Sequence, residues 1–166
     1  MVKDTILVID VDVDGIQEIM NILSGSYRIC TAGSFEDALL IIRDIIPELI
    51  LIDSTMSAKD GFDILEFLKT NDRSSHIPVI FITPLDNPDF EVRAFDMGSV
   101  DYITKPFVPK VVRKRIETQI KLAKYEHKLE ELVEEKVSEI EDMYDIMAIS
   151  FAGLVESRDG ITGGHL

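Results

Sequence analysis

The stretch Pro47-Glu48-Leu49-Ile50-Leu51-Ile52-Asp53 predicts a buried strand that ends at a carboxylate. Its four consecutive apolar residues lie between Pro47 and a loop expected at residues 54–59. A short continuous apolar run of this kind is typical of a parallel strand that is covered on both faces. In open α/β sheets, ligands bind in the crevice at the carboxyl ends of such strands. Asp53 is therefore the first candidate for a functional residue.

Four further strands are predicted, at residues 5–10, 27–31, 78–83 and 100–103. Apolar residues at helical spacing lie between them, so strands and helices alternate five times along the chain. Such alternation is typical of an α/β protein whose parallel sheet carries helices on both faces and is joined by right-handed crossovers. We therefore expect a doubly wound five-stranded parallel sheet with the flavodoxin-like order 2-1-3-4-5.

Cap and turn signals set the expected ends of the helices. Ser34 is expected to cap the second helix. Asp60-Gly61 is a turn signal, so the third helix is expected to begin only at Phe62. The fourth helix is expected at residues 90–97 and to be closed by Gly98.

Polar side chains follow the apolar core of four of the five strands: Asp10, Asp53, Thr83 and Lys105. In the order 2-1-3-4-5 the first and third strands are neighbours, so Asp10 is expected to lie beside Asp53. The hydroxyl of Thr83 and the ammonium of Lys105 would then occupy the far side of the same crevice. Two acids, a hydroxyl and an ammonium are thus expected to converge.

This combination of groups suits phosphoryl transfer. Clustered carboxylates require a cation, and oxygen ligands with open water positions favour Mg²⁺ over a transition metal. A cation, Lys105 and the Thr83 hydroxyl together would hold a dianionic phosphoryl group. A carboxylate beside them can act as the nucleophile and form an acyl phosphate.

Over roughly residues 3–123, the chain resembles the receiver domain of two-component response regulators. The resemblance is carried by Asp10, by Asp53 followed by Asp60-Gly61, by Ile82-Thr83, and by the run Gly98-Ser99-Val100-Asp101-Tyr102-Ile103-Thr104-Lys105-Pro106-Phe107. It implies that Asp53 accepts a phosphoryl group from a sensor histidine kinase in the presence of Mg²⁺. It also implies that the chain is a regulatory phosphoacceptor and not a turnover enzyme.

The same resemblance assigns roles to individual residues. Thr83 and Tyr102 would form the switch pair, and Lys105 would face the phosphoryl group and precede a cis peptide bond to Pro106. The protein ligands of the metal would be Asp10, Asp53 and the backbone carbonyl of Thr55.

Two positions depart from the family pattern. The family usually has a second acid directly after the first, and here that position is Val11. Asp12 follows one residue later, so either Asp12 substitutes for the missing ligand or Mg²⁺ binding is weakened. The second departure is Pro84, where the family favours a small residue, and it is expected to stiffen the loop after the switch threonine.

Each site residue also has a purely structural interpretation when it is considered singly. Asp10 and Asp53 can be helix N-caps at strand–helix junctions, and Thr83 can cap the helix that follows it. Tyr102 can be an ordinary half-buried aromatic residue, and Lys105 a solvated loop lysine. If Val11 has abolished metal binding, the domain is a degenerate, phosphorylation-independent dimerisation module.

Composition restricts the partners and the location. The net charge of −14 argues against a nucleic-acid surface, which requires a basic patch. The single cysteine, Cys30, argues against a disulfide framework and is consistent with a reducing compartment. Neither a signal peptide nor a membrane span is expected, so the predicted location is the cytoplasm, with no membrane partner.

Beyond residue 109 the sequence predicts one long helix with a heptad seam, and no helix breaker stands before Gly153. The apolar positions are 122, 125, 129 and 132, then 133, 137, 140, 144, 147, 151 and 154, with a stutter after Leu132. A helix with one apolar stripe requires a partner, and a second copy of the chain is the simplest. We expect a parallel homodimer through residues 122–154; the alternative is a monomer whose helix frays.

The final residues resemble the opening of an HD-GYP phosphodiesterase domain, in which an Arg-Asp pair is followed by Thr-Gly-x-His. The matching residues are Arg158-Asp159 and Thr162-Gly163-Gly164-His165. That family hydrolyses cyclic di-GMP at a multi-metal site, and His165 would match a metal ligand, whereas Ile161 stands where many members have Glu. The expected organisation is a receiver at 1–123, a coiled-coil signalling helix at 124–156 and the start of an output domain at 157–166. The chain would then be the regulatory half of a cyclic di-GMP phosphodiesterase.

Overall fold

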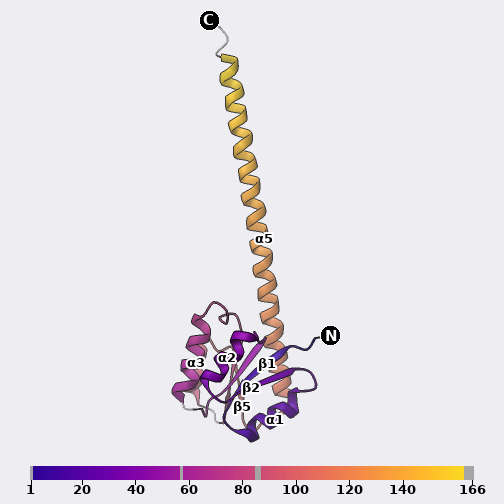
Figure 1. The fold of residues 1–166 in the computed structure, drawn as a ribbon, viewed down its shortest axis with the longest axis vertical. Coiled ribbons are helices and arrows are strands. Elements are labelled where there is room, and N and C mark those ends of the chain that lie inside the picture. Colours follow the sequence, from indigo (N-terminus) through magenta and orange to yellow (C-terminus); the bar gives the residue numbers. More distant parts are fainter. Residues whose placement is uncertain (1, 57, 85–86, 163–166) are drawn as a thin grey trace. The chain divides into compact units, whose positions relative to one another are not determined.

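The computed structural model describes residues 2–56, 58–84 and 87–162, and it divides into two units, Met1–Ala123 and Lys124–Leu166. The first unit contains a five-stranded parallel sheet with the order β2-β1-β3-β4-β5, which confirms the predicted topology. Helices flank this sheet (Figure 1). The strands are β1 (Thr5–Ile9), β2 (Arg28–Ala32), β3 (Leu49–Asp53), β4 (Val79–Thr83) and β5 (Asp101–Thr104). The helices are α1 (Val13–Leu23), α2 (Phe35–Asp44), α3 (Ala58–Thr70), α4 (Pro88–Asp96) and α5 (Pro109–Thr162).

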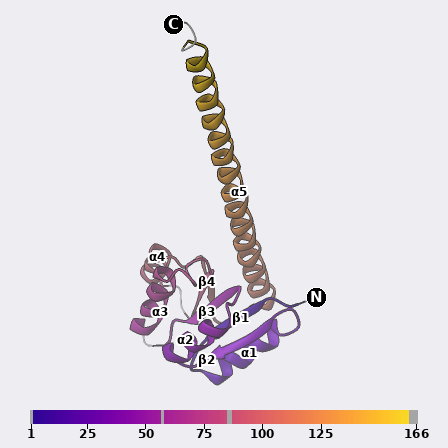
Figure 2. The same cartoon turned by 45° about the horizontal axis from the view of Figure 1, so that its top comes forward.

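Alternating strand residues build one hydrophobic core on each face of the sheet. One core contains Leu7, Ile9, Ile50, Ile52 and Phe81 and is covered by α2, α3 and α4 (Figure 2). The other contains Ile6, Val8, Leu49, Leu51 and Ile80 and is covered by α1 and by the part of α5 that carries Val112, Ile116 and Ile120. The continuous apolar runs in the sequence therefore have the predicted cause, because both faces of β1, β3 and β4 are buried.

The third helix begins earlier than the sequence predicted. It starts at Ala58, so Asp60-Gly61 lies inside α3 and the predicted turn is wrong. A β-carbon on Gly61 would lie 3.4 Å from Phe81 Cε1. Gly61 therefore allows α3 to pack closely against the sheet, and this tertiary contact overrides the local turn signal.

The fourth helix also begins two residues earlier than predicted. Asn87 is its N-cap, with a side chain that accepts a hydrogen bond from the Phe90 N–H at 3.2 Å, and Pro88 occupies the first turn, where its missing N–H is harmless. Gly98 follows the helix with φ +106°, a conformation that favours glycine, as its predicted role requires. Ser34 caps α2 as predicted and accepts a hydrogen bond from the Asp37 N–H at 3.1 Å.

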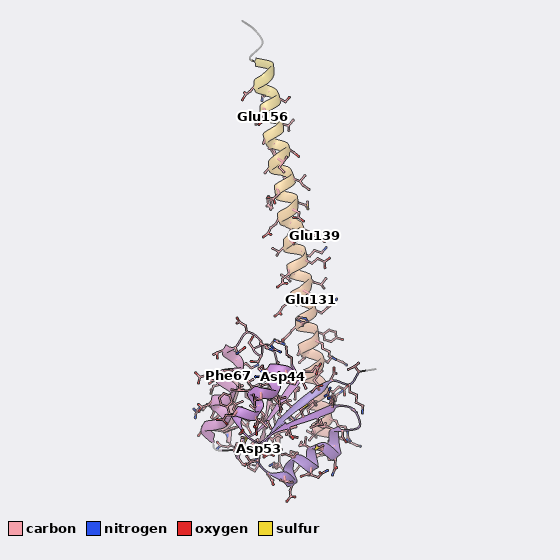
Figure 3. The ribbon with its side chains drawn as sticks, in the orientation of Figure 1. Asp44, Asp53, Phe67, Glu131, Glu139 and Glu156 are labelled. Carbon is pink, nitrogen blue, oxygen red and sulfur yellow. The ribbon has the colours of Figure 1, made fainter. Side chains whose placement is uncertain are left out.

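The second unit is the remainder of α5. The helix continues through Gly153 to Thr162, and the side chains of residues 124–160 are all exposed. Glu131, Glu139 and Glu156 are spaced along it (Figure 3). Within the described part of the chain, no helix combines the length and the hydropathy that are required to cross a bilayer.

Candidate functional site

The carboxyl ends of β1 and β3 bring two acids together. Ile9 pairs with Ile52 in the parallel register, so Asp10, directly after β1, lies beside Asp53, the last residue of β3. Asp53 is labelled in Figure 3. Both acids are almost completely buried, with exposed fractions of 2% for Asp10 and 0% for Asp53. Two carboxylates thus lie close together inside the protein, as the strand order predicted.

Asp53 is hydrogen-bonded through both of its carboxylate oxygens. Lys105 Nζ lies 2.7 Å from Oδ2, and the Thr55 N–H and hydroxyl donate to Oδ1 at 2.8 and 2.6 Å. The peptide bond between Lys105 and Pro106 is cis, as the resemblance predicted. The Thr55 hydroxyl is a contact that the sequence analysis missed, because only the backbone carbonyl of Thr55 was considered there.

The two acids differ in their protonation equilibria. Burial acts to raise the pKa of Asp53, but hydrogen bonds from Lys105 and Thr55 outweigh it and hold the pKa below its ordinary value. Burial raises the pKa of Asp10, and the neighbouring Asp53 adds to this rise, against the hydrogen bond from the Asp12 N–H. The pKa of Lys105 is raised despite its partial burial, because it pairs with Asp53. One ammonium therefore faces two buried carboxylates, and the site has an excess of negative charge.

Asp12 lies at the rim of this site. It is the N-cap of α1, and its Oδ1 accepts a hydrogen bond from the Asp14 N–H at 3.2 Å. Val11, at the position where the family usually has an acid, is 61% exposed. A β-carbon on Gly15 would lie 3.0 Å from Asp10 Oδ2, 3.3 Å from Asp12 Oδ2 and 3.5 Å from Lys105 Nζ. Gly15 was not predicted from the sequence to border these groups, although a glycine in the first turns of a helix after an acidic run was a usable signal.

The predicted switch residues lie on neighbouring strands. Thr83 ends β4, is 4% exposed and pairs in register with Thr104 of β5. Tyr102 of β5 is half-buried, and its ring is in edge-to-face contact with Phe95 at a centroid separation of 6.1 Å. The Arg115 guanidinium lies 5.6 Å from the centroid of the Tyr102 ring. A pocket beside this tyrosine is lined by residues of β5, of the loop that follows it and of α5.

The oxygen donors at the strand ends fit a small, hard cation such as Mg²⁺. Asp10 and Asp53 would supply carboxylate oxygens, and a cation there would neutralise the charge that Lys105 leaves unbalanced. Among the described residues, no three His, Cys, Asp or Glu side chains already form a group that could hold a metal ion. Mg²⁺ usually keeps several of its waters in protein sites, so one or two carboxylates are enough to hold it.

A second candidate surface is the exposed helix of residues 124–160. Its seam includes Leu129, Val137 and Ile140, which are 62%, 48% and 52% exposed. From residue 146 to residue 155 the sequence has no charged residue. Ile149 is 73% exposed and lies nine residues, about two and a half turns, from Ile140, on the opposite side of the helix. The last turns are therefore apolar on more than one side, beyond what a single seam requires.

A family model for the response regulator receiver domain matches residues 6–117. A Vibrio cholerae protein described as a probable cyclic di-GMP phosphodiesterase is 34% identical over 169 residues, covering 98% of this chain and 38% of that protein. The phosphate regulon regulatory protein PhoB of Pseudomonas aeruginosa is 30% identical over 73% of this chain and 49% of its own length. The chain thus spans about half or less of the length of these relatives.

Solved structures are similar to the first unit. NtrX from Brucella abortus, in complex with ADP, matches 78% of this chain and 29% of its own at 28% identity and a TM-score of 0.72. The isolated receiver domain of NtrX matches 70% of this chain and 98% of its own, with 30% identity and a TM-score of 0.64.

Proposed function

The chain belongs to the response regulator receiver domain family, a regulatory and not a catalytic unit, and on that premise we propose that Asp53 is its phosphoacceptor. The observation that carries this proposal is the environment of Asp53. The side chain is completely buried at a strand end, and yet it stays ionised because Lys105 Nζ lies 2.7 Å away. An ionised carboxylate beside an ammonium can act as a nucleophile toward a phosphoryl group.

In the proposed reaction, a carboxylate oxygen of Asp53 forms a bond to phosphorus while the phosphorus–nitrogen bond of a phosphohistidine in a sensor kinase breaks. Lys105 exchanges its contact with Asp53 for a phosphoryl oxygen, and the two hydrogen bonds from Thr55 hold the other carboxylate oxygen in place. Bound Mg²⁺, held by Asp10, Asp53 and the Thr55 carbonyl, would supply positive charge to the transferring group. The Thr83 hydroxyl then binds the phosphoryl group at the same sheet edge.

The proposed signal leaves the site through Thr83 and Tyr102. A hydroxyl that moves toward the phosphoryl group frees space at the end of β4, and the ring of Tyr102 moves into it. That movement alters the contacts of Tyr102 with Phe95 of α4 and Arg115 of α5. Because Arg115 also pairs with Asp101 at 2.6 Å, the change reaches the start of the long helix.

We further propose that the chain forms a parallel homodimer through residues 122–154. The apolar stripe on residues 124–154 is exposed in a single chain and repeats at three- and four-residue steps, which is the pattern of a two-stranded seam. Burial of apolar surface contributes roughly 25 cal/mol per Å², so a stripe of this length favours association. The acidic residues on the other faces remain solvated.

A second proposal concerns what the receiver regulates. The chain is proposed to be the regulatory half of a metal-dependent cyclic di-GMP phosphodiesterase. The support is its 34% identity to the Vibrio cholerae protein, which extends over 98% of this chain and 38% of that protein. The observation that favours this is the charge-free run from residue 146 to residue 155, which is apolar on more than one side. A helix that is apolar all round is normally buried, and an output module would cover the sides that a two-stranded seam leaves open. His165, the predicted ligand match, lies outside the described residues.

Phosphoryl transfer is tested by intact-mass detection of an adduct after incubation with a small acyl phosphate, with and without Mg²⁺. The chain, Asp53→Asn and the exposed control Asp44→Asn are compared, since each variant removes one carboxylate charge. We expect a single Mg²⁺-dependent phosphoryl adduct in the chain and in the control, and none in Asp53→Asn. A folded chain that forms no adduct at any Mg²⁺ concentration would instead be a phosphorylation-independent dimerisation module.

A further inference from the structure

Charged residues flank the apolar seam of α5 in a regular order. In a heptad the seam occupies positions a and d, position g directly precedes each a, and position e directly follows each d. A step of three residues along the seam leads from a to d, so the a positions are 122, 129, 137, 144 and 151. The d positions are 125, 132, 140, 147 and 154, and Val133 becomes the d position after the stutter.

The two flanks of this seam carry opposite charges. Over residues 121–155, every charged residue at a g position is a lysine and every charged residue at an e position is a glutamate. The g lysines are Lys121, Lys128 and Lys136, and the e glutamates are Glu126, Glu134 and Glu141. All six side chains are exposed, so they are accessible to a second helix that covers the seam.

This order of charges distinguishes the two orientations in which two copies of the helix can pair. In a parallel coil, a g residue lies beside the e residue of the following heptad in the partner. Lys121 then faces Glu126 of the partner subunit, and Lys136 faces Glu141 of the partner subunit. In an antiparallel coil, g lies beside g and e beside e, so lysine would meet lysine and glutamate would meet glutamate. Like charges destabilise by about as much as opposite charges stabilise, so the order favours the parallel pair.

The lysines make only weak contacts within one chain. Lys136 Nζ lies 3.1 Å from Glu139 Oε2, and Lys128 Nζ lies 4.0 Å from Glu131 Oε2. Both pairs are exposed and lie within one turn of the helix, where an ion pair contributes little to stability. A partner helix can therefore take over these lysines without breaking a strong contact.

We propose that the charges at the e and g positions select a second copy of the chain, parallel and in register, as the partner of α5. This rests on the proposed homodimer and adds the residues that determine its orientation. Two-fold symmetry makes each ion pair occur twice, so the two kinds of pair give four contacts. The later e and g positions, Met143, Ala148, Ser150 and Val155, carry no charge, so the selection depends on residues 121–141.

The first test exchanges the charges and measures association of the full chain by sedimentation equilibrium at low ionic strength. One double variant is Lys121→Glu with Lys136→Glu, and the other is Glu126→Lys with Glu141→Lys. Each alone should dimerise about 10- to 1000-fold more weakly than the parent, because four attractive contacts become repulsive. An equimolar mixture of the two should form a heterodimer of parent-like affinity. The weakening should shrink in about 1 M salt, where the Debye length is only about 3 Å.

A control variant and a crosslink complete the test. Glu130→Lys with Glu135→Lys makes the same change in net charge at exposed positions outside a, d, e and g, and it should dimerise at least as tightly as the parent. Leu122→Cys, in a chain whose own thiol is removed by Cys30→Ser, should give a disulfide-linked dimer on mild oxidation. In an antiparallel coil residue 122 would lie beside residue 154, about 48 Å from its counterpart, and no link would form.

The outcomes separate the role of the charges from the existence of the dimer. Parent-like dimers of both double variants, an equal weakening of the control, or a dimer that does not crosslink through residue 122 would overturn the proposal and leave a homodimer in place. A parent chain that sediments as a monomer would overturn both the role of the charges and the proposed homodimer.

Discussion

Replacement of Lys105 by methionine should destabilise the first unit, and the loss should depend on pH. The lysine is the cation 2.7 Å from Asp53 Oδ2, with side-chain exposures of 24% for Lys105 and 0% for Asp53. Methionine keeps the apolar stem and removes the charge. The variant then holds two buried carboxylates, Asp10 and Asp53, with no ammonium beside them.

The magnitude follows from the distance and the burial. At 2.7 Å and an effective dielectric constant of about 20, the Coulomb attraction is about 6 kcal/mol. The variant no longer has to desolvate the ammonium, so the net loss is smaller, and removal of one partner of a buried pair typically costs about 3–5 kcal/mol. Because Lys105 is partly exposed, we expect the free energy of unfolding to fall by about 2–4 kcal/mol at pH 7. This is a large share of the total free energy of unfolding of a domain, which is roughly 5–15 kcal/mol.

The pKa of Asp53 determines how the stability loss in Lys105→Met changes with pH. In the parent chain the pKa of Asp53 lies below its ordinary value, so its contribution to stability is present above the unfolded pKa of about 3.9 and is lost only as the pH falls through the lower folded value. Without Lys105, burial raises the pKa of Asp53. The folded variant then takes up a proton in mild acid, where the unfolded chain does not, and regains stability as the pH falls toward 4.

The assay is urea unfolding in EDTA between pH 4.5 and pH 8, followed by circular dichroism. Hydrogen exchange of the β3 amides reports the first unit separately from the exposed helix. Lys136→Met is the matched control, because Lys136 is 66% exposed and its loss should cost less than about 0.5 kcal/mol. Equal stability of the two variants at pH 7, or a Lys105→Met loss that is as large at pH 4.5 as at pH 7, would refute the reasoning.

Three further changes have defined outcomes. Asp10→Asn removes a buried carboxylate whose pKa is raised, so urea unfolding without cations should show a gain in the free energy of unfolding of about 1–3 kcal/mol at pH 7. The gain should shrink as the pH falls through the pKa of Asp10, because the parent carboxyl is then protonated, and an unchanged or lower stability at pH 7 would contradict this. Val137→Glu should convert the dimer to a monomer in analytical ultracentrifugation. Ser138→Glu, at the next position and turned about 100° away from Val137, lies outside the seam and should leave the mass unchanged; a dimer in both would exclude the seam. Gly98→Ala should lower the free energy of unfolding by about 1–2 kcal/mol in thermal denaturation, because φ is +106° and the added carbon would lie 3.2 Å from Lys69 Cγ; an unchanged melting temperature would count against backbone strain.

The start of α3 illustrates where sequence patterns mislead. Asp60-Gly61 has the composition of a turn, yet the helix begins at Ala58. Gly61 is close to Phe81 of β4, a residue twenty positions later in the sequence. A local sequence pattern gives no information about such a contact. Gly15 is a similar case, because the atoms that surround its missing side chain come from separate elements. In both places glycine serves a close approach and not a turn.

The sequence by itself determined the fold and which polar residues lie at one edge of the sheet. Continuous apolar runs require strands covered on both faces, their alternation with helices requires a parallel sheet, and the order of that sheet brings Asp10, Asp53, Thr83 and Lys105 to one edge. These features depend on the local spacing of apolar residues, which can be observed directly in the sequence. The pattern also predicted the cap at Ser34 and the glycine after α4.

Only the tertiary structure decided the charge states within the site. Asp10 and Asp53 are the same residue type at equivalent places, and their pKa values are nonetheless shifted in opposite directions. The difference arises because the single nearby ammonium, from a residue 52 positions after Asp53, bonds to Asp53 and not to Asp10. Electrostatic interactions inside a protein depend on distance and burial, and these quantities exist only once the chain has folded.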